Sequence, residues 1–172
     1  MCIRDSNLGV GEIIITDVDS EGTLKGTNKN LIKKIQYDSR INFVGNLARK
    51  KLLKKLQDYD LAVFPSIWME TSCIALMEAM SAGLMCVHPN LAALPETAAN
   101  WTYMYQFTEN PNEHANRFGQ CLIEAIELYK NESKRPMLMQ RLNMQKVYAN
   151  SFYSWDSRKI EWEGMLRGLL QS

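Results

Sequence analysis

Two glutamates eight residues apart, Glu70 and Glu78, have the residue type and spacing that best suit binding chemistry in this chain. Glu70 follows a short apolar run that ends at Pro65-Ser66, and Glu78 stands alone inside an apolar stretch that begins at Cys73. A carboxylate buried without hydrogen-bond donors is unfavourable, and the vicinal hydroxyl groups of a ligand would supply such donors. We therefore expect both side chains to bind hydroxyl groups. The alternatives are an exposed loop acid for Glu70 and a solvated residue on a half-exposed helix for Glu78.

The residues between the two glutamates predict the start of a helix. Thr71 or Ser72 is a suitable N-cap, and Gly83 favours the left-handed conformation that ends a helix. The helix that we expect over Ser72–Ala82 is apolar nearly all round, so both of its faces should be buried. Its free N–H groups and positive dipole end suit a phosphate. A nucleotide sugar has a phosphate group between two sugars. Two carboxylates that bind sugar hydroxyls, with a phosphate site between them, would match this arrangement.

The elements that must position these residues alternate between strand and helix. Short β-branched or apolar runs predict strands, and apolar residues at helical spacing predict helices. We expect strands over Glu12–Thr16, Ile41–Val44, Leu61–Phe64 and Met85–His88. We expect helices over Asn28–Tyr37, Lys50–Tyr59 and Ser72–Ala82, and then over Asn112–Asn131, Pro136–Ala149 and Trp155–Leu170. This order predicts an α/β fold, a Rossmann-like doubly wound parallel sheet with helices on both faces and a helical C-terminal segment. Ligands of such sheets bind beyond the carboxyl ends of the strands.

The composition is that of one soluble globular domain. The chain has 172 residues, 46% hydrophobic and 23% charged, which excludes a disordered or coiled-coil protein, and no run is long enough to span a membrane. Four scattered cysteines and two histidines predict reduced thiols, no metal site and a cytoplasmic protein. Residues 1–6 lack the apolar run of a signal peptide. We expect an unstructured or truncated start over 1–10 and one domain over 11–172, with a helical tail from about residue 112.

The charge of the chain is unevenly distributed. Ten of the lysines and arginines lie between Lys25 and Lys55, where Asp38 is the one acid. Such a strip suits phosphates, an anionic membrane surface or nucleic acid. Few aromatic residues lie nearby to stack on bases, which argues against nucleic acid. We expect the strip to form the solvated faces of two helices, with peripheral membrane contact as the open alternative.

The segment around the two glutamates resembles a known family, the group 1 type of retaining, nucleotide-sugar-dependent glycosyltransferases of the GT-B fold. The donor-binding, C-terminal domain of that family carries two glutamates separated by seven residues, after Pro-Ser and before Leu-Pro-Glu. The matching positions here are Pro65-Ser66, Glu70, Leu76–Gly83 and Leu94-Pro95-Glu96, together with Ile41–Gly45, Asp60–Phe64 and Phe152–Asp156. The resemblance runs from about Ile13 to Leu170 and implies one half of a GT-B fold.

The resemblance also implies roles for individual residues. Glu70 would contact hydroxyls of the donor sugar at the catalytic site, and Glu78 would hold the 2′ and 3′ hydroxyls of the ribose. The other donor-binding positions would be Thr71, Ser72, Cys73 and Ile74 beside the sugar and diphosphate, and Gly45, Asn46 and Leu47 beside the base. The implied enzyme is hexosyltransferase-like. It transfers a sugar from a nucleotide-diphosphate sugar to a glycan, lipid or protein acceptor with retention, and it needs no cofactor or metal.

This sequence departs from the family in two respects. The family opens its C-terminal domain with a strand followed by an Arg and a Lys that clamp the diphosphate. Arg49 and Lys50, which we place in a post-strand loop, do not match that motif. The acceptor-binding N-terminal domain is absent from this chain, so we expect a missing domain or a partner chain to complete the enzyme.

Other functions remain as alternatives. The chain could be a non-catalytic nucleotide-sugar-binding module or a subunit of a split enzyme. Asp17 and Asp19 after the first strand suggest phosphotransfer, but Thr23-Leu24 follow too late for the phosphatases that use such a pair. A dinucleotide site is not expected, because no Gly-x-Gly-x-x-Gly follows a predicted strand.

Overall fold

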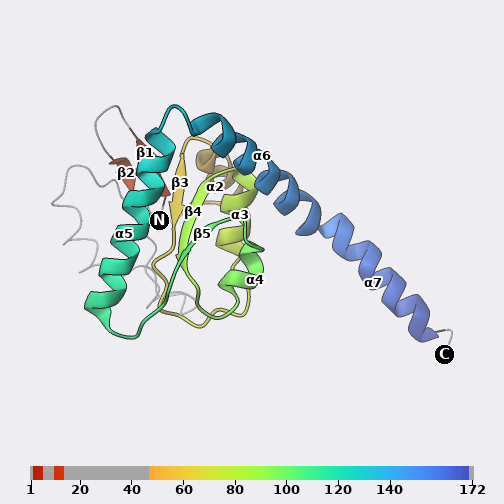
Figure 1. Ribbon diagram of the computed structural model, residues 1–172. Helices are drawn as coiled ribbons and strands as arrows, with labels where there is room; N and C mark the ends of the chain where they lie inside the picture. The colour runs from red at the N-terminus through yellow and green to blue at the C-terminus, as the bar shows by residue number, and fades with distance from the viewer. Residues whose placement is uncertain (1, 6–9, 14–46, 171–172) are drawn as a thin grey trace.

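The computed structural model describes residues 2–5, 10–13 and 47–170 (Figure 1). The expected helix Asn28–Tyr37, the expected strand Ile41–Val44 and the aspartates Asp17 and Asp19 lie outside the described residues. So do Gly45 and Asn46, two of the positions that we assigned to the base.

A five-stranded sheet in the order β2-β1-β3-β4-β5 forms the centre of the molecule. Its strands are β1 (Cys2–Asp5), β2 (Val10–Ile13), β3 (Leu61–Val63), β4 (Met85–Pro89) and β5 (Tyr103–Tyr105). The last three are parallel, as we predicted for β3 and β4, with Leu61 opposite Met85 and Val87 opposite Tyr103. β4 lies between two neighbours and all five of its residues are buried, which explains its continuous apolar pattern.

The start of the chain differs from our expectation. We expected no element before residue 11 and a sheet that is parallel throughout, but β1 pairs antiparallel with both β2 and β3. Ile3 has Ile13 as its partner on one side and Leu61 on the other. The pairing gives partners to the outer backbone groups of β3, which would otherwise form a sheet edge. β1 was missed because its sequence, Cys-Ile-Arg-Asp, has one β-branched residue and two charged ones and so lacks the apolar run from which we predicted strands.

Helices cover both faces of the sheet, as predicted. Successive residues of a strand point to opposite faces. Leu61, Val63, Met85 and Val87 pack with α5 (Pro111–Lys130), whereas Ala62 and Cys86 pack with α3 (Ile74–Ala82). α2 (Arg49–Leu56) and α4 (Leu94–Ala98) join the α3 side, and Figure 1 shows α5 apart from α3 and α4.

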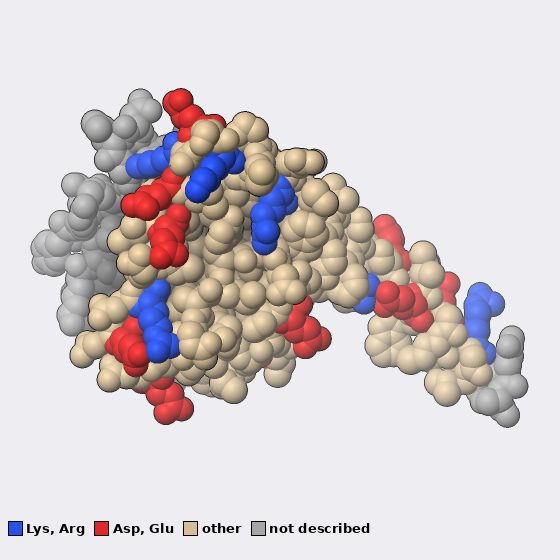
Figure 2. Space-filling model, in the orientation of Figure 1, with Lys and Arg blue, Asp and Glu red and all other residues tan. Residues whose placement is uncertain are grey.

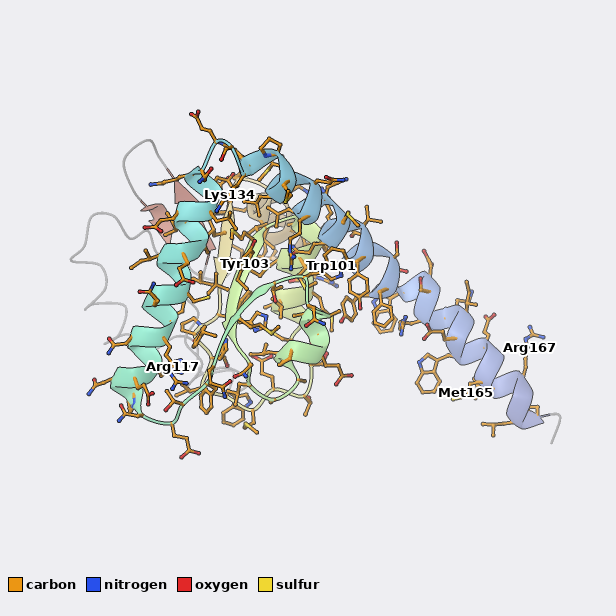
Figure 3. The ribbon with its side chains drawn as sticks, in the orientation of Figure 1. Trp101, Tyr103, Arg117, Lys134, Met165 and Arg167 are labelled. Atoms are coloured by element: carbon orange, nitrogen blue, oxygen red, sulfur yellow. The ribbon has the colours of Figure 1, made fainter. Side chains whose placement is uncertain are left out.

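The C-terminal third is helical, as expected. α5 begins after Asn110, whose side chain accepts N–H bonds from Asn112 and Glu113, and Pro111 occupies its first turn. α6 (Arg135–Phe152) packs along α3, where the Gln145 Nε2 group donates to the Leu84 carbonyl at 2.8 Å. α7 (Trp155–Leu170) buries none of its residues and projects away from the sheet, as the positions of Met165 and Arg167 show (Figure 3).

Candidate functional site

Glu70 lies beyond the carboxyl end of β3, in the loop that leads to α3. Hydrogen bonds donated by backbone N–H groups fix this loop. The Trp68 N–H donates to the buried Ser66 Oγ at 3.2 Å, and the Glu70 N–H donates to the Trp68 carbonyl at 3.0 Å. The Ala93 N–H donates to the Glu70 carbonyl at 3.2 Å, which ties the loop to the segment after β4. Glu70 is therefore held at the edge of the sheet where ligands of such folds bind.

The carboxylate of Glu70 makes no hydrogen bond or ion pair with the described part of the chain. The three residues before it are exposed although they are large and apolar. Their exposed fractions are 66% for Ile67, 64% for Trp68 and 67% for Met69. A partly exposed, unpaired carboxylate beside an exposed apolar loop is a surface that a ligand or a further domain can cover.

Glu78 lies eight residues further along the chain and is the fifth residue of α3. Its side chain is only 15% exposed, and its Oε1 accepts a hydrogen bond from the Arg49 Nε at 2.9 Å. The need for a donor that we predicted for Glu78 is thus met in part by an arginine. We placed Arg49 in a loop, which is wrong, because it is the first residue of α2. Nothing in the sequence pattern links two residues that are 29 positions apart.

The start of α3 also differs from the prediction. The helix begins at Ile74 with Cys73 as its N-cap, so neither Thr71 nor Ser72 caps it, and both are exposed. A side-chain cap is worth about 1 kcal/mol, and burial of an apolar side chain is worth at least as much. Cys73, which is 4% exposed, goes into the core and fixes where the helix starts. The side chain of the N-cap residue Cys73 makes no capping hydrogen bond to the first N–H groups of α3, whose positive end lies beside Glu70.

The expectation that both faces of α3 are buried is wrong in its first turn. Ile74 is 63% exposed and Ala75 is also exposed, whereas Leu76, Ala79 and Met80 are buried. The exposed turn lies at the edge of the sheet beside Glu70. The surface around the first turn of α3 therefore includes both a carboxylate and apolar side chains.

Of the base-side positions, the structure describes Leu47. It is half-buried and lies two residues before Arg49, which contacts Glu78. α2 then carries five basic residues in eight and has no acid in its first turn. In contrast to this basic helix, the face of the molecule visible in Figure 2 carries basic and acidic side chains next to one another.

His88 ends close to the same sheet edge but belongs to the core. It is fully buried, with ring nitrogens 2.9 Å from the Pro89 carbonyl oxygen and 2.7 Å from the Thr102 Oγ1. Burial lowers the pKa of His88 below its ordinary value, and the bond to Pro89 only partly opposes this effect. The ring is therefore neutral and structural. Among residues 2–5, 10–13 and 47–170, no three His, Cys, Asp or Glu side chains lie close enough together to hold a metal ion.

A cavity of about 660 Å³ lies away from the two glutamates, between β5 and the two helices α5 and α6. Trp101 and Tyr103 line it together with Lys134, and all three are labelled in Figure 3. None of the predicted donor-binding residues contributes to its lining. Within the described part of the chain, no helix is both long enough and apolar enough to cross a membrane.

The sequence of this chain matches one family model over most of its length. The model described as glycosyl transferases group 1 covers residues 10–135. A curated relative, a phosphoribosyl imidazole-4-carboxamide isomerase from Clostridium acetobutylicum, is 34% identical over 80 residues. That match covers 44% of this chain, and the chain spans only about a third of the length of the isomerase, 33%. It is too short to show a shared family.

Solved structures share the fold at low identity. A glycosyltransferase from Rickettsia africae ESF-5 is 14% identical with a TM-score of 0.68, over 94% of this chain and 40% of that chain. The catalytic domain of starch synthase IV from Arabidopsis thaliana, solved with ADP and acarbose, is 17% identical with a TM-score of 0.62. That match covers 84% of this chain and 29% of the synthase chain. These likenesses support the predicted fold class, and the chain spans less than half of either structure.

Proposed function

Because the chain belongs to the group 1 glycosyl transferases, we propose that it is the donor-binding part of an enzyme that transfers a sugar from a nucleotide-diphosphate sugar with retention of configuration. One observation carries this proposal. Glu70 lies in the loop just before α3, beyond the carboxyl end of β3, and the largely buried Glu78 lies inside α3, so the positive end of this helix falls between them in the sequence. Carboxylates bind hydroxyl groups and an uncapped helix end suits phosphate, so this arrangement suits a diphosphate flanked by two sugars.

The residues would act mainly by binding and orienting the donor. The carboxylate of Glu78 would accept hydrogen bonds from the ribose hydroxyls, and Glu70 would accept them from the transferred sugar. The backbone N–H groups at the start of α3, from Cys73 and Ile74 onward, would face the negative charge that develops on the leaving diphosphate. Thr71 and Ser72 would border the same group, and Gly45, Asn46 and Leu47 would border the base. Fixing the donor in this way lowers the barrier by orientation and electrostatics.

The acceptor is not determined by these residues. Since the chain spans 40% and 29% of the two similar structures, we propose that a further domain or a partner chain binds a glycan, lipid or protein acceptor. The starch synthase structure contains ADP, which supports a nucleotide as the ligand class. We propose a cytoplasmic location. The exposed lysines of α2, Lys50, Lys51 and Lys54, would suit a peripheral contact with an anionic membrane.

Ligand-observed NMR of the purified 172-residue chain tests the proposal, with UDP, GDP, ADP and their sugar conjugates as probes. This method detects millimolar affinities, which correspond to about −4 kcal/mol and suit half of a binding cleft. We expect saturation transfer to one nucleotide, its loss in Glu78→Ala, and weaker binding of the sugar conjugate in Glu70→Ala.

The matched control is Glu127→Ala, which removes an exposed glutamate from α5 on the other face of the sheet and should change nothing. Equal nucleotide affinity in the wild type and in Glu78→Ala would refute the ribose assignment. Release of nucleoside diphosphate from the sugar conjugate would separate a catalytic chain from a module that only binds.

A further inference from the structure

The contact between Arg49 and Glu78 joins two elements that border the proposed donor site. Arg49 begins α2, just after the base-side residue Leu47, and Glu78 lies inside α3. The arginine side chain is 70% exposed, whereas the glutamate side chain is 15% exposed. The 2.9 Å bond from Nε to Oε1 therefore connects a solvated cation to a largely buried carboxylate.

The contact is poorly explained as a device for stability. Ion pairs with an exposed partner contribute little to the free energy of unfolding. The first turn of α2 carries Arg49, Lys50 and Lys51 and no acid, and cations at the positive end of a helix are unfavourable. The position of Arg49 thus has an electrostatic cost for α2, which a role in binding would explain.

Arg49 and Glu78 each keep hydrogen-bonding atoms that their mutual contact does not occupy. Arg49 donates through Nε, and the structure gives its two Nη groups no bond within the described residues. The Oε2 of Glu78 is likewise without a bond to any described residue. One carboxylate oxygen is fixed by the arginine while the second can accept hydrogen bonds from a ligand.

We propose that Arg49 is a positioning residue for nucleoside binding, which holds the Glu78 carboxylate in the orientation that receives the two ribose hydroxyls. This inference rests on the proposed function. An arginine suits the task because the planar guanidinium fixes the orientation of a carboxylate, whereas the lysine ammonium is a point charge. A direct contact between Arg49 and the diphosphate is the competing explanation.

A double-mutant cycle separates the two explanations. The 172-residue chain is titrated with ADP, GDP and UDP and with the corresponding nucleosides, as the wild type, Arg49→Ala, Glu78→Gln and the double variant. Arg49→Ala should weaken nucleoside and nucleoside diphosphate by the same factor, about tenfold, and should have less than about a twofold effect in the Glu78→Gln background. Arg49→Lys should restore part of the affinity. The matched control Lys159→Ala removes an exposed lysine charge from α7 and should leave both affinities unchanged.

Three results would overturn the positioning role. A loss confined to the diphosphate would assign Arg49 to the phosphates, and an equal loss with and without Glu78 would show that the arginine acts independently. If Glu78→Gln weakens binding and Arg49→Ala does not, the positioning role of Arg49 is refuted while the proposed function still stands. A wild-type chain that binds none of the probes would refute both. Thermal unfolding of each variant shows whether a changed affinity reflects a changed fold. A fold defect from Arg49→Ala would weaken nucleoside and diphosphate binding by one factor, but it would do so in the Glu78→Gln background as well.

Discussion

Gly83 ends α3, the helix that carries Glu78, in a left-handed conformation with φ 87° and ψ 19°. Its N–H bonds to the Met80 carbonyl at 3.0 Å, and the Leu84 N–H bonds to the Ala79 carbonyl at 3.1 Å. This pattern closes the helix and turns the chain into β4. Replacing Gly83 by alanine changes the helix end without touching the donor-binding residues.

The structure separates the steric effect of this replacement from its conformational effect. A Cβ at Gly83 would lie 3.6 Å from the Lys146 Cδ, which is an ordinary van der Waals distance. The cost is therefore that of an L-residue in the left-handed region, about 1–2 kcal/mol. The lower entropy of alanine in the unfolded chain offsets about 0.4–1 kcal/mol of that cost. We expect a net loss of about 1 kcal/mol, which lowers the melting temperature of a chain of this size by about 2–4 °C.

Gly119→Ala is the matched control. Gly119 lies within α5, and a Cβ there would meet nothing within 4 Å. The same chemical change should therefore stabilise the chain by about 0.5–1 kcal/mol, because alanine favours a helix interior. Urea unfolding followed by circular dichroism compares the wild type with both variants. A Gly83→Ala variant as stable as the wild type would refute the conformational cost, and a loss well above the about 1–2 kcal/mol of that cost would contradict the ordinary contact with Lys146.

Two predictions concern pH. The pKa of His88 is lowered by burial, so the unfolded chain takes up a proton before the folded chain does, and stability is lost as the pH falls below about 6.5. His88→Asn should remove a slope of up to about 1.4 kcal/mol per pH unit from urea unfolding in mildly acidic buffers, and an unchanged slope would contradict the buried neutral ring. Burial and the bond to Asp60 raise the pKa of Tyr129 to about 12. The stability that this raised pKa provides is fully present below the pKa of about 10 in the unfolded chain, and it is lost as the pH rises through about 12. Tyr129→Phe should lower the free energy of unfolding by about 1 kcal/mol and remove one high-pKa phenol from an ultraviolet titration; an unaltered titration would show that Tyr129 ionises normally.

The predictable parts of the fold are those that depend on local pattern. Burial on both faces makes Met85–Pro89 a continuous apolar run, and Pro111 after Asn110 is a strong signal for the start of α5. The start of α3 could not be predicted because the weak capping preference of Thr71 and Ser72 competes with burial of Cys73 in the core. β5 has three residues, too few to show an alternating pattern.

The elements that carry the two glutamates of the candidate site were predictable, and the contacts of these glutamates were not. The sequence places Glu70 in a loop and Glu78 in a helix, and the structure has both there. The partner of Glu78 could not be predicted, because charge pairing along a helix involves residues three or four apart, whereas Arg49 is 29 residues away. On sequence alone, any of the ten basic residues between Lys25 and Lys55 could have been the partner of Glu78.

The exposure of α7 has a consequence for how this segment folds. None of its 16 residues is buried, Gly164 and Gly168 weaken it, and the ion pairs Arg158–Glu161 and Lys159–Glu163 contribute only a few tenths of a kcal/mol each. An isolated helix of this length is marginal in water, so it exchanges with coil conformations. Any surface that binds the exposed apolar stripe Trp162, Leu166 and Leu169 would therefore also have to order residues 155–170, and the entropy lost on ordering would reduce the affinity of that contact.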